Sequence, residues 1–305
     1  MPHTFYTPYR TKGSLALPSL RGIKRVTKPM SLGDPQPPRI EGDRRIMPAR
    51  PVAAARDMAK VMLTRYPKAY DSLRRPYAAA RFWMRRPHDP DYGVFALFPE
   101  CRGVFLDVGA NAGMSALSFR IYNRTSPIVS IEPNPFHEDD LRFAGRLAKS
   151  LTYRMWAAGR EDDTMELHVP VYRNVPLTTE ASLLAQAVTD SPSLRARLGS
   201  RMDTDDFEIA TCVVPVRPLD SLNLDPAFIK LDVQGFEHEA LLGLEATLRR
   251  AHPVLLIETP GEEVRSFLSG LAYDAFTYLP RESRIVPETR CATNTVFVSS
   301  TNSGL

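Results

Sequence analysis

The sequence of 305 residues contains no long apolar run and only three cysteines. A membrane-spanning helix needs about 18 or more consecutive apolar residues, whereas the best apolar run, "PVLLIET" at 253–259, has the length of one buried strand. The N-terminus also lacks the apolar core of a secretory signal peptide. The cysteines, Cys101, Cys212 and Cys291, are widely spaced and odd in number, so they do not indicate a disulfide framework. We therefore expect a cytoplasmic protein with reduced thiols and no membrane span.

Sequence patterns for metal and phosphate binding are missing as well. None of the six histidines stands at metal-ligand spacing from another, which argues against a typical Cys/His zinc site. The P-loop pattern G-x-x-x-x-G-K-[ST] does not occur. Asp232 and Glu258, both at the ends of expected strands, carry the oxygen ligands that Mg²⁺ prefers, but two such carboxylates are also common without a metal. We predict no metal site.

Positive charge is concentrated in the first third of the chain. Residues 1–90 contain 19 lysines and arginines against 6 acidic residues, whereas the remainder contains 20 against 29. Residues 1–50 are rich in proline and arginine and have no acidic residue before Asp34, so we expect a basic, mostly irregular arm. Residues 51–87 contain helix-like stretches and are predicted to form a helical cap. Such a region can contact nucleic acid or an anionic membrane surface, or can be a solvated arm.

From residue 88 to about residue 300, short apolar runs alternate with helical patterns. Nearly continuous apolar strands that alternate with helices are typical of a parallel sheet covered on both faces, so an α/β doubly wound fold is predicted. Residues 176–207 interrupt this alternation and are interpreted as an insertion or lid. Strands are expected at 103–108, 127–132, 151–159, 164–169, 207–216, 227–233, 253–259, 272–279 and 293–299, and helices at 113–123, 134–150 and 235–251.

The segment "FLDVGANAG", residues 105–113, marks the predicted ligand-binding turn. In a doubly wound sheet, ligands bind beyond the carboxyl ends of the strands. Gly109 and Gly113 allow the backbone to approach a ligand closely. The dinucleotide fingerprint G-x-G-x-x-G would need glycines where Asn111 and Met114 stand, which argues against a pyrophosphate ligand.

Glu132, at the end of "PIVSIE", lies about twenty residues beyond this turn. A carboxylate at that place suits a ribose diol, because it can accept both hydroxyl protons. A nucleoside without a pyrophosphate fits both observations, and S-adenosylmethionine is the predicted cofactor. Asp107 or the amides of the turn would meet its amino-acid portion and Glu132 its ribose. A second interpretation is that Glu132 only caps the helix that follows.

The segment "IKLDVQGFEHEAL", residues 229–241, is the third candidate feature. Asp232 falls near the end of a core strand, where a charge is costly unless it is paired or used. Gly235 turns the chain into a helix, and Glu237 lies in the first turn of that helix. A carboxylate here could take a proton from a substrate hydroxyl or hold it in line for methyl transfer, so Asp232 and Glu237 are predicted to be catalytic. Glu237 could equally be a favourable charge at a helix N-terminus.

With these features in place, the sequence resembles the FkbM family of S-adenosylmethionine-dependent methyltransferases. The segments that carry the resemblance are "FLDVGANAG", "SIEPNP", "RPLDSL", "IKLDVQGFEHEALLGLEATL", "PVLLIE" and "NTVFV", in this order and within residues 88–299. The resemblance implies a Rossmann-like fold with a seven-stranded, mostly parallel sheet. It also implies O-methylation of a hydroxyl on a sugar or other small molecule. Where the family commonly has Glu, this chain has Gln234. Cofactor roles are implied for Asp107, Gly109, Asn111, Gly113 and Glu132.

Three further functions stay open at this point. The basic arm favours a methyltransferase that acts on RNA or other nucleic acid, but the Asp/Asn-Pro-Pro-aromatic turn of adenine methylation and the Pro-Cys pair of cytosine methylation do not occur. Nucleic acid is therefore not the expected partner, although ribose methylation stays possible. A non-catalytic S-adenosylmethionine-binding protein and an NAD-dependent oxidoreductase are the second and third of these functions. Neither the acceptor nor the oligomeric state follows from the sequence.

Overall fold

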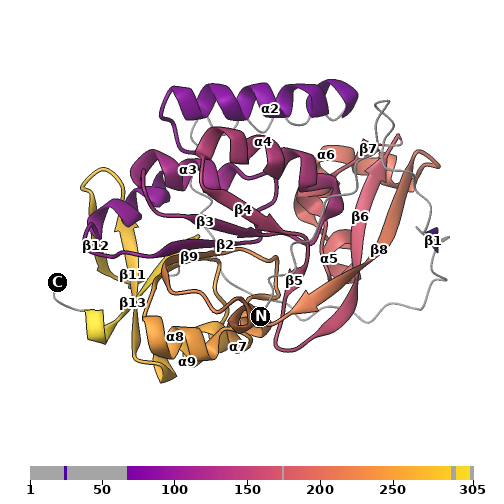
Figure 1. The fold of residues 1–305 in the computed structure, drawn as a ribbon. Coiled ribbons are helices and arrows are strands. Elements are labelled where there is room, and N and C mark those ends of the chain that lie inside the picture. Colours follow the sequence, from indigo (N-terminus) through magenta and orange to yellow (C-terminus); the bar gives the residue numbers. More distant parts are fainter. Residues whose placement is uncertain (1–23, 26–66, 174, 290–292, 303–305) are drawn as a thin grey trace, which may run out of the picture.

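The structure, a computed structural model, describes residues 24–25, 67–173, 175–289 and 293–302. Its main body is an eight-stranded sheet in the order β12-β11-β13-β10-β9-β2-β3-β4 (Figure 1). The strands are β2 (Val104–Val108), β3 (Ile128–Ile131), β4 (Leu151–Arg154), β9 (Pro226–Leu231), β10 (Val254–Glu258), β11 (Tyr273–Leu279), β12 (Arg284–Pro287) and β13 (Asn294–Ser299).

The strand directions confirm the predicted Rossmann-like, doubly wound fold. β4, β3, β2, β9 and β10 are parallel neighbours, whereas β13 runs antiparallel between β10 and β11. The sheet has eight strands where seven were expected, because β12 forms a hairpin with β11 and adds one more edge strand. From β2 the chain first builds β3 and β4 on one side and later β9 and β10 on the other. This reversal of strand order places the ligand-binding edge at the carboxyl end of β2.

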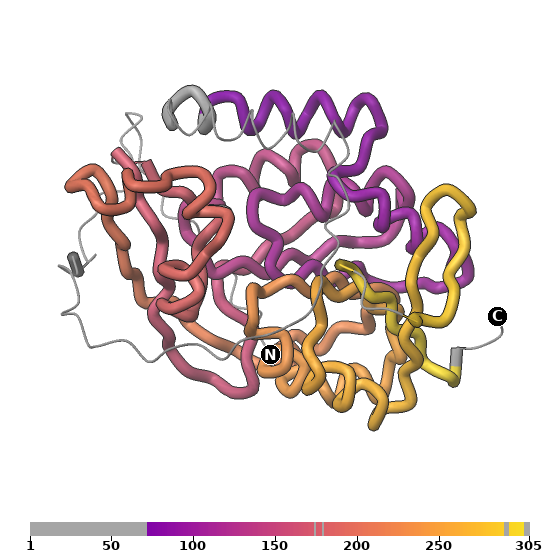
Figure 2. The backbone as a smooth tube through the Cα atoms, turned by 180° about the vertical axis from the view of Figure 1, so that it is seen from behind, coloured from indigo at the N-terminus to yellow at the C-terminus, as the bar shows by residue number. Residues whose placement is uncertain are grey.

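Helices cover both faces of the sheet (Figures 1 and 2). Successive strand residues point to opposite faces, so Phe105 packs in one buried cluster and Leu106 in another. One face carries α2 (Pro67–Trp83), the 3₁₀ helix η1 (Pro90–Leu97), α3 (Met114–Tyr122) and α4 (Glu138–Ala148), and the other carries α7 (Glu237–Leu242), α8 (Glu245–Ala251) and α9 (Glu262–Gly270).

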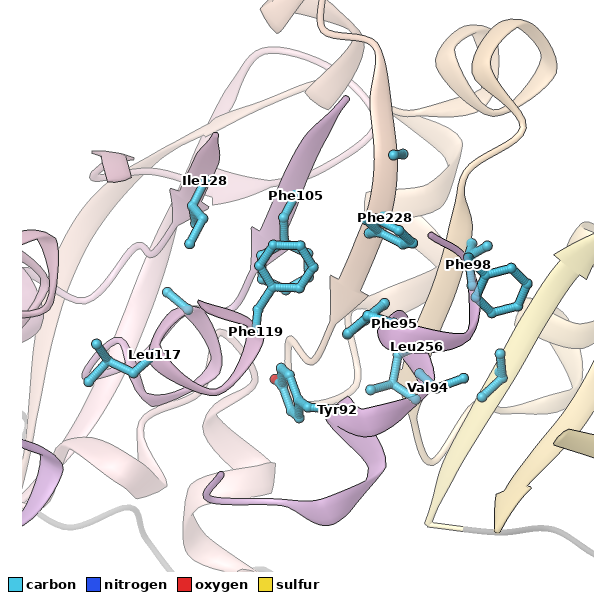
Figure 3. Packing of buried hydrophobic residues seen from close by; sticks show 14 of the residues in the cluster. Tyr92, Val94, Phe95, Phe98, Phe105, Leu117, Phe119, Ile128, Phe228 and Leu256 are labelled. Atoms are coloured by element: carbon cyan, nitrogen blue, oxygen red, sulfur yellow. The ribbon is translucent and has the colours of Figure 1, made fainter. Parts of the chain in front are cut away.

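An aromatic cluster fixes the segment that leads into β2 (Figure 3). The rings of Phe105 and Phe119 are stacked with their centroids 3.9 Å apart. Phe95 of η1 meets Phe105, Phe119 and Phe228 edge-on at 5.3–5.4 Å. Edge-to-face contacts at this distance are favourable beyond the apolar area they bury. The chain between α2 and β2 is therefore packed against the sheet, on the face that also carries α3 and α4.

A second, smaller sheet stands beside the large one and was not expected from the sequence. It consists of β1 (Lys24–Arg25), β5 (Ala157–Ala158), β6 (Asp163–Tyr172), β7 (Val175–Pro176) and β8 (Phe207–Arg217). The single strand predicted at 151–159 is wrong, because β4 belongs to the large sheet and β5 pairs with β8 in the small one. The chain thus leaves the large sheet after Arg154 and builds a wall beside its carboxyl edge.

Residues 176–207 form short helices that pack on the small sheet. Buried Val188, Leu194 and Leu198 join Tyr172 and Leu177 in a core of their own. These helices are η3 (Thr178–Glu180), α5 (Ala185–Thr189), α6 (Pro192–Leu198) and η4 (Gly199–Asp203); the other 3₁₀ helices are η2 (Pro135–His137), η5 (Leu219–Leu222) and η6 (Ser300–Asn302).

Two further expectations differ from the structure or lie beyond it. The helix predicted at 235–251 is divided into α7 and α8 at Gly243, where a Cβ would lie 1.9 Å from the carbonyl oxygen of Gly159. Apart from β1, the predicted arm at 1–50 lies outside the described residues, as does the first part of the predicted cap, up to residue 66. Within the described ranges, no helix has the length and apolar character to cross a membrane.

Candidate active site

The turn after β2 brings the ends of two strands into close contact. Gly109 has a φ of +81°, and a Cβ on it would lie 1.8 Å from the carbonyl oxygen of Asp232. Only glycine leaves room for that approach. Gly113 has a φ of +79°, but its missing Cβ leaves space for Ala144 of α4, 2.6 Å from where the Cβ would be. Gly109 thus shapes the edge of the sheet, whereas Gly113 allows α3 and α4 to pack.

Glu132 fastens this turn from the neighbouring strand. Its Oε2 accepts a hydrogen bond of 2.7 Å from the backbone amide of Asn111, and its Oε1 accepts one of 2.8 Å from the amide of Asn134. Burial raises the pKa of Glu132, and the nearby His137 and the two amides offset part of that rise. Helix α4 begins only at Glu138. Glu132 therefore joins two loops of the site, and its bond to Asn134 also lies at the start of the helical segment that opens with η2 at Pro135.

Asp107 lies behind the turn and is fully buried. Its Oδ2 accepts hydrogen bonds from the hydroxyls of Ser115, at 2.7 Å, and Ser130, at 3.1 Å. Burial raises the pKa of Asp107 to about 6, although both hydroxyls and the charge of Lys230 lower it. These contacts tie β2 to α3 and β3. Asp107 is not among the residues that line the cleft, but its Oδ1 is buried and has no hydrogen-bond partner among the described residues, and its contact with the cofactor stays a prediction.

A cleft opens along the carboxyl ends of β3, β2 and β9. It holds about 680 Å³ of space, part of it open to solvent. Its sheet side includes Gly109, Asn111, Glu132, Asn134, Asp232 and Gln234. Its opposite wall comes from the small sheet and the 176–207 segment, and includes Ala157, Ala158, Leu167, Thr178, Ser182 and Leu183.

Asn134 offers a hydrogen-bond donor to this cleft. Its Oδ1 accepts a hydrogen bond from the amide of Phe136, which fixes the orientation of the side-chain amide. Its Nδ2 is buried and has no hydrogen-bond partner among the described residues. Buried polar groups are nearly always bonded, so an unmet donor in a cleft indicates a place for a ligand acceptor.

A buried lysine lies between two carboxylates at the ends of β9 and β10. The Nζ of Lys230 is 3.9 Å from Asp232 Oδ2 and 3.9 Å from Glu258 Oε2, and it donates to the carbonyl of Leu231 at 3.2 Å. Burial raises the pKa of Glu258 to about 7, with a further rise from the adjacent carboxyl of Asp232 and a reduction from the charge of Lys230. The two acids and the lysine therefore form one cluster beside the cleft, in which each charge affects the pKa of Glu258.

Glu237 does not face the cleft. Its Oε1 accepts from the amide of Val233 at 3.1 Å, and its Oε2 accepts from the amide of Gly235 at 3.0 Å. These bonds stabilise a turn in which Gln234 and Gly235 have φ values of +55° and +96°. The position fits the second interpretation, a favourable charge at a helix N-terminus, and Glu237 is not among the residues that line the cleft; its catalytic role stays a prediction.

Gln234 has a specific contact in this turn. Its Nε2 donates to Asp232 Oδ1 at 3.0 Å. A glutamate at this position would have no such donor and would add a third carboxylate beside Asp232 and Glu258. The glutamine therefore suits the crowding of negative charge at this edge.

Of the predicted site residues, the cleft brings together Gly109, Asn111, Glu132 and Asp232. The sequence reasoning missed Lys230 and Asn134, although both stand in segments that it had singled out. A lysine inside the apolar run "AFIKLDV" is the signal that could have revealed the first. In the described part of the chain, no group of three or more His, Cys, Asp and Glu side chains is arranged to hold a metal ion.

Comparison with known proteins agrees with the sequence resemblance. The family model described as "Methyltransferase FkbM domain" matches residues 107–275. No curated protein gives a significant match.

Among solved structures, an FkbM methyltransferase from Methylobacillus flagellatus KT is similar to this chain, with 18% identity and a TM-score of 0.41. The match covers 64% of this chain but only 43% of that one. A precorrin-6y C5,15-methyltransferase from Geobacter metallireducens GS-15 has 12% identity, a TM-score of 0.37 and coverage of 68% and 84% of the two chains. A TehB-like SAM-dependent methyltransferase from Corynebacterium glutamicum ATCC 13032 Kitasato has 11% identity, a TM-score of 0.37 and coverage of 78% and 100%.

The close approach at Gly109 predicts a large effect of one added methyl group. Gly109→Ala is expected to lower the free energy of unfolding by about 3 kcal/mol, because the new Cβ would push β2 and β9 apart at their carboxyl ends. Gly261→Ala is the control, since nothing lies within 4 Å of a Cβ there. Urea denaturation of both variants measures the difference, and equal stabilities would contradict the assigned role of Gly109.

Proposed function

Because the chain belongs to the FkbM family of methyltransferases, whose model matches residues 107–275, we propose that it uses S-adenosylmethionine to methylate a hydroxyl group on a sugar or other small molecule. One observation carries this proposal. A single cleft joins the tight turn at Gly109, the buried carboxylate of Glu132 and the strand-terminal Asp232. The turn suits the amino-acid end of the cofactor, Glu132 suits its ribose, and Asp232 suits the hydroxyl of the acceptor.

The residues of the cleft fit the chemical groups of S-adenosylmethionine. Each carboxylate oxygen of Glu132 accepts one hydrogen bond from a backbone amide. Each can accept one more, so together they can bind the two hydroxyls of a ribose. Ala157, Ala158 and Leu167 provide a small apolar wall for a base, and the buried Nδ2 of Asn134 provides a donor near it. The turn at Gly109 would receive the amino-acid end. These residues would hold the cofactor, which supplies a methyl group activated by a sulfonium.

The coupled acids supply the proton chemistry that a hydroxyl acceptor requires. Asp232 lines the cleft, and Glu258 ends the adjacent strand, which lies about 4.8 Å away in a sheet. A carboxylate in this place can accept the hydroxyl proton as the oxygen becomes methylated. Lys230 keeps a positive charge within reach of both acids and so limits their mutual repulsion. These side chains would thereby align the hydroxyl and accept its proton.

The charge at this edge favours a neutral acceptor. Asp232 and Glu258 lie beside a single lysine, and Asp89 adds further negative potential at Glu258. A phosphate-rich acceptor would be repelled there. This supports a neutral polyhydroxyl compound over nucleic acid, whose case depends on a basic arm outside the described residues.

Cofactor binding tests the first part of the proposal. Calorimetric titration with S-adenosylmethionine is expected to give binding that Glu132→Ala weakens by about 10- to 100-fold, because hydrogen bonds to a charged group are lost. Glu138→Ala serves as the control and should bind normally, because Glu138 is a half-buried acid on α4 that does not line the cleft. Binding of NAD in place of S-adenosylmethionine would contradict the proposal.

The pH profile tests the proton acceptor. With a pKa of about 7, Glu258 is increasingly a carboxylate as the pH rises through 7, so the rate of methyl transfer should rise over that range and then level off. Labelled methyl from S-adenosylmethionine and a panel of methyl glycosides and other hydroxyl compounds provide the assay. Glu258→Gln is expected to slow transfer by about 10²- to 10⁴-fold and to remove the inflection, whereas Glu262→Gln, an exposed acid on α9, should not. An unchanged profile in Glu258→Gln would exclude this role.

A further inference from the structure

Helix α2 precedes the matched family domain, yet it lies close to the cleft. The family match begins at residue 107, whereas α2 spans Pro67–Trp83. In Figures 1 and 2 the helix lies across α4, and its N-terminal end points toward the 176–207 segment. This arrangement places a helix from outside the family domain next to one wall of the cleft.

Arg74 connects α2 to two other parts of the molecule. Its guanidinium forms an ion pair with Asp140 of α4. Its Nη1 donates to the hydroxyl of Thr178, at 3.1 Å. Thr178 belongs to η3 and lines the cleft. The fixed fork of a guanidinium suits such a bridge, because separate nitrogens point to separate partners.

The ion pair that anchors Arg74 is partly buried. The side chain of Arg74 is 18% exposed and that of Asp140 only 3%. Burial tends to raise the pKa of Asp140, but the nearby His137 and the two arginines, Arg74 and Arg75, lower it below its ordinary value. Asp140 is therefore a carboxylate at neutral pH and holds the arginine in place.

The other end of η3 is also fixed by polar contacts. Glu180 accepts hydrogen bonds from the hydroxyls of Ser191, at 2.9 Å, and Ser193, at 2.5 Å, and from Nη1 of Arg197, at 3.1 Å. These donors belong to α6 and the residue before it. Thr178 thus lies between the contacts with α6 and the hydrogen bond from Arg74, in a segment that also pairs with β6 through the backbone of Leu177 and Ser182.

Arg75 provides an internal comparison. Its Nε donates to Asp140 Oδ1 at 2.8 Å, so it shares the carboxylate with Arg74. Its side chain is 44% exposed and pairs with Asp139 and Asp140 of α4. Both arginines thus bind Asp140, but Arg74 also donates a hydrogen bond to Thr178 in the wall of the cleft.

We propose that Arg74 is a positioning residue for cofactor binding, which makes α2 a part of the site. By holding Thr178, it keeps the wall formed by η3 and the residues after it in the arrangement that receives the ligand. A preformed wall favours binding because less order has to be imposed when the ligand arrives. The inference rests on the proposed function, in which this cleft holds S-adenosylmethionine.

Calorimetry with S-adenosylmethionine tests the proposal in the full-length protein. Arg74→Ala is expected to raise the dissociation constant about tenfold, whereas Arg75→Ala should change it by less than about twofold. Thr178→Val should weaken binding like Arg74→Ala, and the double variant should be no weaker than either, because both changes remove one contact. Hydrogen exchange of residues 178–183 should accelerate in Arg74→Ala and not in Arg75→Ala.

The outcomes separate this inference from the proposed function. Equal dissociation constants for Arg74→Ala and Arg75→Ala, or additive effects of Arg74→Ala and Thr178→Val, would overturn the role of Arg74 while leaving the cofactor assignment intact. Wild-type protein that binds no S-adenosylmethionine would instead contradict the proposed function and, with it, a role of Arg74 toward that cofactor. Melting temperatures of the two arginine variants show whether a general loss of stability explains the result.

Discussion

The buried carboxylate of Glu132 accepts two backbone amides, and the shape of the cleft depends on these two bonds. One amide belongs to Asn111, in the turn after β2, and the other to Asn134, in the loop after β3. Both loops leave the carboxyl edge of the sheet where the strand order reverses, and the amides of Gly109 and Ala110 also donate to the carbonyl of Ile131 there. The same carboxylate is the group that we assign to the ribose. Architecture and ligand recognition therefore depend on one side chain, which explains why an acidic residue occupies a buried position.

The opposite wall of the cleft has a different physical origin. It comes from the small sheet and the 176–207 segment, which have clusters of their own, and it meets the rest of the protein through apolar contacts of Phe136 and Ala158 and through polar contacts such as that of Arg74 with Thr178. This wall contributes Ala157, Ala158 and Leu167 to the lining of the cleft, whereas the sheet side is built on Gly109 and Glu132.

The sequence predicted the large sheet and part of the site for clear physical reasons. An apolar run that reaches an acid at Asp107 or Glu132 is a strong local signal for a strand with a polar end. Gly109, directly after the first of these runs, is a strong local signal for a tight turn. Local patterns could not show that Glu237 binds the amides of its own turn, because a capping acid and a catalytic acid look alike in the sequence. They also could not show that residues 151–159 divide between two sheets, or that Arg74 reaches a residue more than one hundred positions away. Such contacts depend on tertiary packing, which periodicity does not encode.

A structure of the protein with S-adenosylhomocysteine bound would test the account most directly. We expect the ribose hydroxyls to lie on the carboxylate of Glu132, the base to contact Ala157 and Ala158, and the sulfur to face the side of the cleft where Asp232 and Glu258 stand. A nucleoside bound elsewhere, or bound in this cleft with its ribose away from Glu132, would contradict the central claim.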